Sequence, residues 1–241
     1  MKPIKFLIGS MLALLVATLF HPLTVKAQGI EYISDRQLRM IVESDQIPLH
    51  REVNIDGTPF LVDDFLPGTI ILPNGRTTET MQLRYNTYNQ SVDFMSNGEA
   101  HRIDGQLIRE FTLQINGVAH TFKKGFDASR LDESDFVQIL EDGALTFFVK
   151  HTTNLIEDTA SYGVATRNDV YRPNENYYVR EKSGNIDRLR RLDERRLRGY
   201  FKDYEDEIAS FVSANNIDYT NPSDVASLFR HYNSLVQNTQ N

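Results

Sequence analysis

Cysteine and tryptophan are both absent from this chain of 241 residues. Without cysteine there is no disulfide, no thiolate ligand for a metal and no lipid-modified N-terminal cysteine, so side-chain packing has to stabilise the fold. Basic residues are outnumbered, with 26 Lys and Arg against 33 Asp and Glu, and the net charge is −7. This balance argues against a general nucleic-acid-binding protein, which would present a basic domain.

Long apolar runs are also scarce, and the clearest one lies at the N-terminus. Phe6–Phe20 follows the basic start Met1–Lys5 and precedes Val25–Ala27, which offers small or modest residues to a signal peptidase. The apolar run is shorter than the roughly 20 residues that span a bilayer. The pattern predicts a cleaved signal peptide over residues 1–27 and no transmembrane segment after it. A soluble periplasmic or secreted location is therefore expected.

Turn-forming pairs punctuate the middle of the chain. Six Asn-Gly or Asp-Gly pairs, which accept the positive φ angles of tight hairpins, begin at Asp56, Asn74, Asn97, Asp104, Asn116 and Asp142. Both residues of Asn116-Gly117 are predicted to have φ above zero. Strands joined by such short turns must pair antiparallel.

Between these turns, apolar and polar residues alternate as in half-buried strands. The predicted strands are Thr58–Val62, Thr69–Leu72, Thr78–Tyr85, Ser91–Met95, Glu99–Ile103, Arg109–Ile115, Val118–Lys123 and Ala144–Lys150. A sheet of about eight short strands is expected to curl. The predicted fold class is α+β, mainly antiparallel β, with a curved meander or half-barrel of about eight strands followed by three C-terminal helices.

The two central strands of this sheet carry apolar side chains on one face: Met81, Leu83, Tyr85, Val92 and Phe94. This face meets either a packed core or a ligand. If it meets a ligand, these residues are the candidate ligand-facing positions of a half-barrel that carries a lipid or another hydrophobic molecule.

The remaining segments complete the predicted domain organisation. Residues 28–182 form the β-meander domain, in which Ile30–Val42 is a short helix or an irregular lead-in. Phe136–Leu140 fits a helical turn or a strand, and the pattern fades over Thr152–Glu175, which predicts a mobile loop. Residues 183–241 show helical periodicity and are expected to pack on the sheet.

The chain shows no constellation of residues that amounts to catalysis or metal binding. The mature histidines are scattered, and neither a G-x-S-x-G elbow nor a phosphate-binding glycine loop is present. Asp63 and Asp64 could contribute to a carboxylate pair, or to a calcium site with Asp56 and Asp104, but acids are common in turns. No catalytic, cofactor-binding or metal-ligating residue is predicted.

A cluster of arginines in the C-terminal segment is the most basic part of the chain: Arg188, Arg190, Arg191, Arg195, Arg196 and Arg198. These residues are a candidate anion patch, because arginine forks suit phosphate and carboxylate groups. The interleaved Asp187, Asp193 and Glu194 allow the simpler interpretation of an exposed helix with internal ion pairs.

A second polar cluster lies at the end of a central strand. Tyr85, Asn86, Tyr88 and Asn89 combine aromatic rings with amides, which could bind a sugar. Asn is also a common turn residue, and the structural interpretation is favoured.

Three segments carry a resemblance: GTPFLVDDFLPGTIILPNGRTTETMQLRYNTYN, EDGALTFFVKH and YFKDYEDEIASFVSANNIDYTNPSDVASLFRHYNSL. In these the chain resembles uncharacterised exported cell-envelope proteins of Bacteroidota. The resemblance implies an envelope location and a β-meander with terminal helices, and it supplies no activity. Asp158-Thr159-Ala160 resembles the site that such bacteria O-glycosylate, so Thr159 is a candidate glycosylation site.

Three hypotheses for function follow. The favoured one is a non-enzymatic interaction or structural module of the cell envelope, without a cofactor, whose partner is an envelope protein, lipid or polymer. The first alternative is a periplasmic carrier of a hydrophobic ligand. The second is a hydrolase of envelope polymers, which would need a cleft lined by carboxylates.

Overall fold

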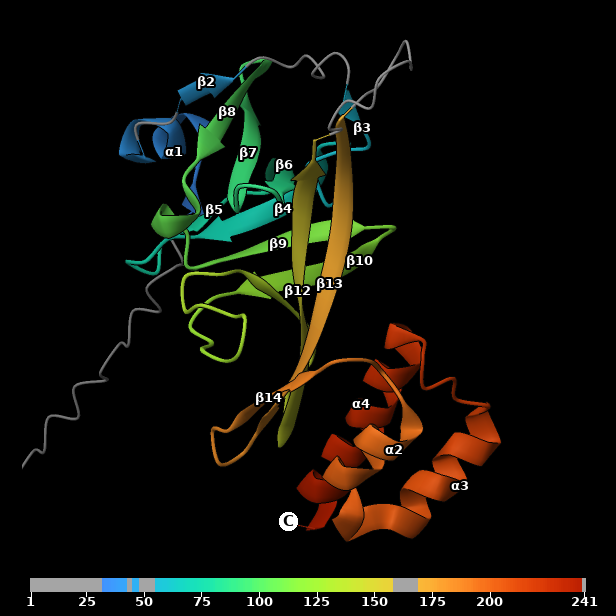
Figure 1. Cartoon of the computed structure of the whole chain (residues 1–241). Helices are drawn as coiled ribbons and strands as arrows, with labels where there is room; N and C mark the ends of the chain where they lie inside the picture. The colour runs from blue at the N-terminus through green and yellow to red at the C-terminus, as the bar shows by residue number, and fades with distance from the viewer. Residues whose placement is uncertain (1–31, 43–44, 48–54, 158–168, 240–241) are drawn as a thin grey trace, which may run out of the picture.

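A computed structural model describes residues 32–42, 45–47, 55–157 and 169–239. It confirms an α+β fold in which a large, mostly antiparallel sheet is followed by C-terminal helices (Figure 1). The predicted signal peptide and Thr159 lie outside the described residues. Within the described ranges, no helix has both the length and the apolar character needed to cross a membrane.

The sheet contains 14 strands, more than the roughly eight expected from the turn spacing. The N-terminal elements are β1 (Tyr32–Ile33), α1 (Asp35–Val42), β2 (Asp45–Ile47), β3 (Ile55–Asp56), β4 (Leu66–Ile71) and β5 (Thr77–Thr78). The central elements are β6 (Met81–Asn86), β7 (Ser91–Ser96), β8 (Glu99–Ile103), the 3-10 helix η1 (Gly105–Leu107), β9 (Glu110–Ile115) and β10 (Val118–Lys123). The sheet ends with β11 (Val137–Glu141), β12 (Leu145–Ile156), β13 (Asp169–Glu181) and β14 (Ile186–Leu189).

Short and long helices follow the last strand: α2 (Glu194–Leu197), η2 (Arg198–Tyr200), η3 (Lys202–Tyr204), α3 (Glu205–Asn215) and α4 (Pro222–Thr239). Helical periodicity was predicted for residues 183–241, but β14 lies within this range and its Leu189 pairs with Tyr177. The sheet therefore continues past the predicted domain boundary at residues 182–183.

The order of the strands departs from a simple meander at β4. The main path runs β14-β13-β12-β11-β10-β9-β4-β6-β7-β8-β2, so β4 lies between β9 and β6 and joins two meanders. Pairing along this path is antiparallel, whereas the short strands β1 and β3 pair parallel with β5 and β13. The predicted single continuous meander is therefore replaced by two meanders that share β4.

Two of the predicted tight turns have the expected geometry. Asn97 and Gly98 have φ of 52° and 82°, and Asn116 and Gly117 have φ of 51° and 79°. The Asn116-Gly117 turn sets Val118 opposite Ile115, as a two-residue hairpin requires. Asp104 differs, because its Oδ1 accepts a 2.8 Å hydrogen bond from the Gln106 N–H and begins η1 instead of a hairpin.

The predicted mobile loop over Thr152–Glu175 is largely wrong. β12 continues to Ile156 and β13 begins at Asp169, so the two strands form a long hairpin paired from Leu145–Glu181 to Ile156–Val170. The upper half of this hairpin is only partly buried. Backbone pairing between the two strands, and not a buried apolar face, stabilises it. This explains why the alternation of apolar residues faded there. Residues 158–168 lie outside the described ranges.

The buried apolar side chains gather in two main cores, an upper one and a lower one. The upper core gathers side chains of β1, α1, the strands from β4 to β10 and the segments beside these strands: Ile33, Leu38, Ile70, Leu72, Met81, Leu83, Tyr85, Val92, Phe94, Ile103, Ile108, Phe111, Leu113, Phe122 and Phe136. The lower core joins the lower end of the hairpin to the helices: Leu145, Phe147, Val179, Leu189, Leu192, Leu197, Phe201, Ile208, Val225, Ala226, Leu228, Phe229 and Tyr232. Phe147 of β12 stacks on Phe229 of α4 at 4.9 Å between ring centroids.

Candidate functional site

The five candidate ligand-facing residues all lie in the upper core. Met81 is the most exposed of them at 8%, and the side chains of Leu83, Tyr85, Val92 and Phe94 are at or below 1%. The Tyr85 ring contacts Phe111 at 5.1 Å and Phe122 at 5.4 Å between centroids. The chain's own aromatic rings therefore pack against this face of the sheet.

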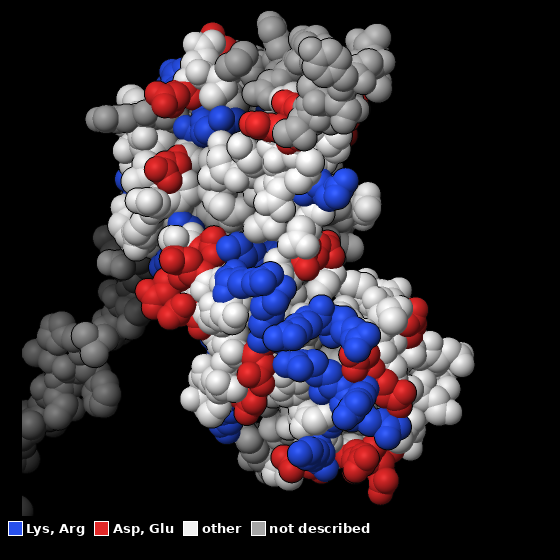
Figure 2. Space-filling model, in the orientation of Figure 1, with Lys and Arg blue, Asp and Glu red and all other residues white. Residues whose placement is uncertain are grey.

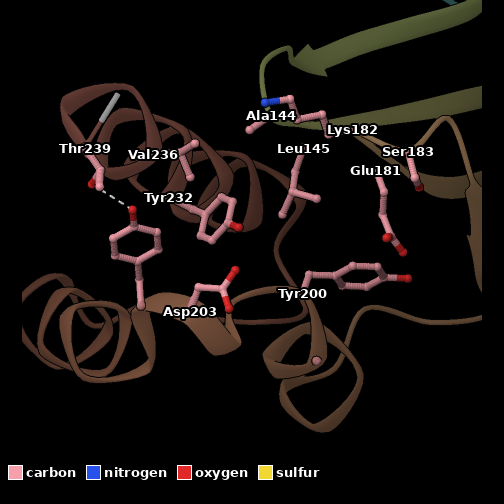
Figure 3. Close-up of a pocket in the computed structure, with 12 residues that line it drawn as sticks. Ala144, Leu145, Glu181, Lys182, Ser183, Tyr200, Asp203, Tyr232, Val236 and Thr239 are labelled. Carbon is pink, nitrogen blue, oxygen red and sulfur yellow. Dashed lines mark hydrogen bonds between the residues drawn. The ribbon is translucent and has the colours of Figure 1, made fainter. Parts of the chain in front are cut away.

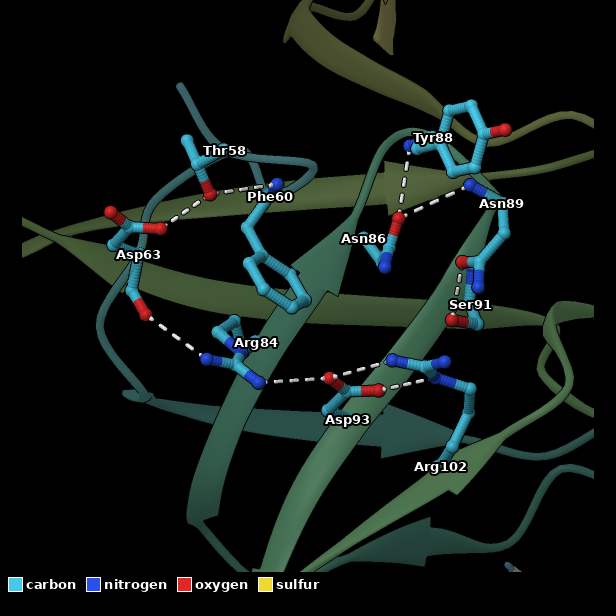
Figure 4. A network of polar contacts seen from close by, with 10 residues as sticks. All are labelled: Thr58, Phe60, Asp63, Arg84, Asn86, Tyr88, Asn89, Ser91, Asp93 and Arg102. Carbon is cyan, nitrogen blue, oxygen red and sulfur yellow. Dashed lines mark hydrogen bonds and ion pairs between the residues drawn. The ribbon is translucent and has the colours of Figure 1, made fainter. Parts of the chain in front are cut away.

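A buried charge network ties β6, β7 and β8 together (Figure 4). The Asp93 carboxylate is fully buried and accepts hydrogen bonds from Arg84 at 3.1 Å and from Arg102 at 2.8 Å. The Arg84 guanidinium also lies 3.7 Å from the centre of the Phe60 ring. Because each charge has a partner, this network fits a structural role.

The predicted tyrosine and asparagine cluster is a turn. Asn86 Oδ1 accepts hydrogen bonds from the backbone N–H groups of Tyr88 at 3.0 Å and Asn89 at 3.1 Å (Figure 4). The Tyr85 hydroxyl donates to Gln90 at 2.7 Å inside the core. These contacts support the structural interpretation of the cluster over a sugar site.

A row of polar side chains crosses β10, β11, β12 and β13. Gln138 bridges two histidines, with Nε2 at 2.7 Å from His120 Nδ1 and Oε1 at 2.8 Å from His151 Nε2. Glu175 continues the row at 3.4 Å from His151 Nδ1 and accepts a hydrogen bond from the Tyr177 hydroxyl. Burial and the nearby His151 lower the pKa of His120, and the hydrogen bond from His151 lowers the pKa of Glu175.

The candidate anion patch forms a basic face over β14 and α2, where Figure 2 shows Lys and Arg gathered in a band. We call the six arginines Arg188, Arg190, Arg191, Arg195, Arg196 and Arg198 the arginine face. Two of them are ion-paired, Arg191 with Asp193 at 3.2 Å and Arg198 with Glu194 at 2.8 Å. The predicted internal ion pairs therefore account for only part of the cluster.

The other four arginines have no carboxylate partner among the described residues. Arg188 donates from Nε at 3.1 Å and from Nη2 at 2.5 Å to the amide oxygen of Asn176, and Arg196 donates to the Arg188 carbonyl at 3.2 Å. Arg190 and Arg195 are exposed and form neither an ion pair nor a side-chain hydrogen bond within the described ranges. Neutral acceptors thus orient Arg188 and Arg196 without compensating their charge.

A pocket of about 560 Å³ lies between the lower end of the hairpin and the helices (Figure 3). Its walls include Leu145 of β12, Val236 of α4 and three tyrosines, Tyr200, Tyr204 and Tyr232. Tyr204 shares a 2.8 Å hydrogen bond with Thr239, and the Tyr200 hydroxyl donates to Asp187 at 3.1 Å.

Two carboxylates line the same pocket on different walls. Figure 3 shows Asp203 of η3 beside Tyr232, and Glu181 of β13 beside the Tyr200 ring. Burial, and then the negative charge of Asp203, raises the pKa of Tyr232. Burial raises the pKa of Tyr200 as well, and Asp187 and Glu181 add to that rise. Both phenols therefore keep their protons at neutral pH.

None of these pocket residues is identifiable from the sequence alone. Tyr200 and Phe201 fit the helical periodicity predicted for residues 183–241, but the chain forms the short 3-10 helices η2 and η3 there. The spacing of Tyr200 and Tyr204 is a signal for a shared aromatic surface, yet β12, β13 and α4 supply the other walls from distant parts of the chain.

In the part of the chain that the structure describes, no three His, Asp or Glu side chains come together as a metal site would require. Asp63 accepts a hydrogen bond from Thr58, and Asp104 caps η1. Comparison with protein-family models, curated proteins and solved structures finds no match.

Proposed function

We propose that the protein is a non-enzymatic interaction module of the cell envelope that binds phosphate groups of an anionic envelope polymer through its arginine face. The single observation that carries this proposal is the set of four arginines that have no carboxylate partner among the described residues, on a chain of net charge −7. Arginine forks match the oxygen geometry of phosphate, and fixed forks lose less side-chain entropy when they bind.

The location is part of the same proposal. A cleaved signal over residues 1–27 would place the mature protein in the periplasm or outside the cell, as the resemblance to exported Bacteroidota proteins implies. Mass spectrometry of the exported protein should give a chain that begins at Gln28, and an uncleaved N-terminus would contradict this. The same spectrum should show a glycan on Thr159 if the modification occurs.

The alternatives receive less support. A half-barrel carrier would hold its ligand against Met81, Leu83 and Phe94, but the chain's own side chains pack there. A hydrolase of envelope polymers would use a pair of carboxylates in a cleft. Asp203 and Glu181 share a pocket, but they lie on different walls and Asp203 is exposed, so they do not form a closed cleft around a substrate.

Binding of long-chain inorganic polyphosphate, measured by fluorescence anisotropy or calorimetry, tests the arginine face. Wild-type protein should bind at low ionic strength and weaken steeply as salt is added. The double variant Arg190→Gln/Arg195→Gln should weaken binding by about tenfold or more. Asn176→Ala should also weaken it, although it changes no charge, because it releases the Arg188 fork.

A matched control separates the arginine face from net charge. Arg36 is exposed and Arg39 is half-buried on α1, far from the face in the fold, and Arg36→Gln/Arg39→Gln removes the same charge. This control should leave polyphosphate binding close to wild type. Equal weakening by both double variants would show attraction to net charge alone and would overturn the proposal.

A further inference from the structure

The pocket of Figure 3 holds polar groups that the fold itself does not use. Asp203 and Glu181 form neither an ion pair nor a side-chain hydrogen bond within the described ranges, in contrast to Asp93 in the upper core. Carboxylates that stabilise a fold are normally paired or hydrogen-bonded. These two are instead left available to a ligand.

The Tyr232 hydroxyl is an independent observation that points the same way. Tyr232 is only 8% exposed and lines the pocket, yet its hydroxyl has no hydrogen-bond partner in the described part of the chain. Among the described residues, the fully buried side-chain atoms without a partner belong to Arg84, Ser96 and His101, so the Tyr232 oxygen is instead open to the pocket, where a ligand can reach it. Tyr200 and Tyr204 each have one, so Tyr232 stands out among the three pocket tyrosines.

From this arrangement we infer that the pocket binds a short aliphatic diamine, with one protonated amine near Asp203 and Tyr232 and the other near Glu181 and Tyr200. Each carboxylate accepts N–H donors, and the Tyr232 oxygen accepts a further one. The Tyr200 ring offers a face to a cation. Leu145 and Val236 supply apolar contacts for the methylene chain between the two amines.

One positive charge in the pocket opposes such a ligand and sharpens the inference. Lys182 follows Glu181 in the chain, lines the pocket and is exposed, and its positive charge repels a cationic ligand. Lys182→Gln should therefore tighten diamine binding. A pocket built for an anionic ligand would respond in the opposite direction.

Calorimetric titration of the full chain with 1,4-diaminobutane tests the inference. The control ligands are 1-aminobutane, which keeps one amine, and 1,4-butanediol, which keeps the shape without charge. Diaminobutane should bind more tightly than aminobutane, and butanediol should show no measurable binding. Asp203→Asn and Glu181→Gln should each weaken diaminobutane by about tenfold, and Tyr232→Phe by about threefold.

The outcomes separate this site from the arginine face. Arg190→Gln/Arg195→Gln should leave diamine binding unchanged, and Asp203→Asn should leave polyphosphate binding unchanged. Butanediol binding as tightly as diaminobutane, preference for a disaccharide such as cellobiose, or no diaminobutane binding at millimolar concentration would each overturn the inference. Thermal melting should show that Asp203→Asn and Glu181→Gln remain folded, since neither side chain has a protein partner to lose.

Discussion

The buried carboxylate of the upper region and the two pocket carboxylates of the lower region differ in their partners. In the upper region, Asp93 is fully buried and held by Arg84 and Arg102. In the lower region, Asp203, Glu181, Arg190 and Arg195 have no charged partner among the described residues. Paired charges fix a structure, whereas unpaired charges at a surface or pocket are free to meet a ligand. We therefore propose a scaffolding role for the upper region and a binding role for the lower one.

The two cores also differ in how they are closed. Strands surround the aromatic centre of the upper core, where Phe111 stacks on Phe122 at 4.6 Å. Helices close the lower core, and Asn233 of α4 joins them to the sheet by hydrogen bonds of 2.9 Å to both the N–H and the carbonyl of Leu145. The helices are therefore anchored on the hairpin, whereas the upper core contains no side chain from α2, α3 or α4.

Removal of one aromatic ring from each core should change the stability of the protein most. Phe111→Ala should lower the free energy of unfolding by about 3–5 kcal/mol and destabilise both regions, because the upper sheet positions the hairpin. Phe229→Ala should cost a similar amount locally and loosen the helices first. Hydrogen exchange measured by segment would check this. If Phe229→Ala instead sped up hydrogen exchange equally in both regions, the two cores would unfold as one unit and the comparison would be wrong.

Neutralisation of one carboxylate in each region should have the next largest effect on stability. Asp93→Asn leaves Arg84 and Arg102 without their counter-charge and should cost about 2–4 kcal/mol. Asp203→Asn should leave stability within about 0.5 kcal/mol of wild type, as expected for a surface substitution without a partner. Chemical denaturation of both variants measures the difference, and equal losses would refute the contrast between paired and unpaired charges.

A glycine in each region offers a smaller test of backbone strain. Gly117 has φ of 79° and Gly199 has no positive φ, and no atom lies within 4 Å of an added Cβ at either position. Gly117→Ala should therefore cost about 1 kcal/mol and Gly117→Val about 1–2 kcal/mol through the backbone alone. Gly199→Ala should be close to neutral. An unchanged melting temperature in Gly117→Val would refute the Asn116-Gly117 hairpin.

The histidine row should give the smallest effect, a dependence of stability on pH. The pKa of His120 is lowered in the folded protein from its ordinary value of 6.5. The unfolded chain therefore binds the proton more readily, so stability is lost as the pH falls below 6.5. Melting temperatures at about pH 7.5 and about pH 5.5 should differ more in wild type than in His120→Gln. Equal differences would remove His120 as the cause.

The upper region was largely predictable from its sequence. Alternation at Met81, Leu83 and Tyr85 identified a half-buried strand, and Asn116-Gly117 fixed a hairpin by local backbone preference. The insertion of β4 between β9 and β6 was not predictable, because a non-local pairing leaves no periodic signal. Whether the sheet curves as a half-barrel stays a prediction.

The binding region was predictable only in part. The arginines stand out in the sequence, but the role of Asn176 depends on its position beside Arg188 across two paired strands. The pocket unites Leu145, Glu181, Asp203 and Tyr232, which come from four separate elements. No local pattern brings such residues together, so tertiary packing has to be known first.

Hydrogen exchange with and without polyphosphate tests most directly whether binding resides in the lower region. Bound polyphosphate should slow hydrogen exchange from β14 to η2, around residues 186–200, and should leave exchange in β6, β7 and β8 unchanged. Slower exchange confined to residues 81–103 would contradict the assignment of scaffold and binding regions.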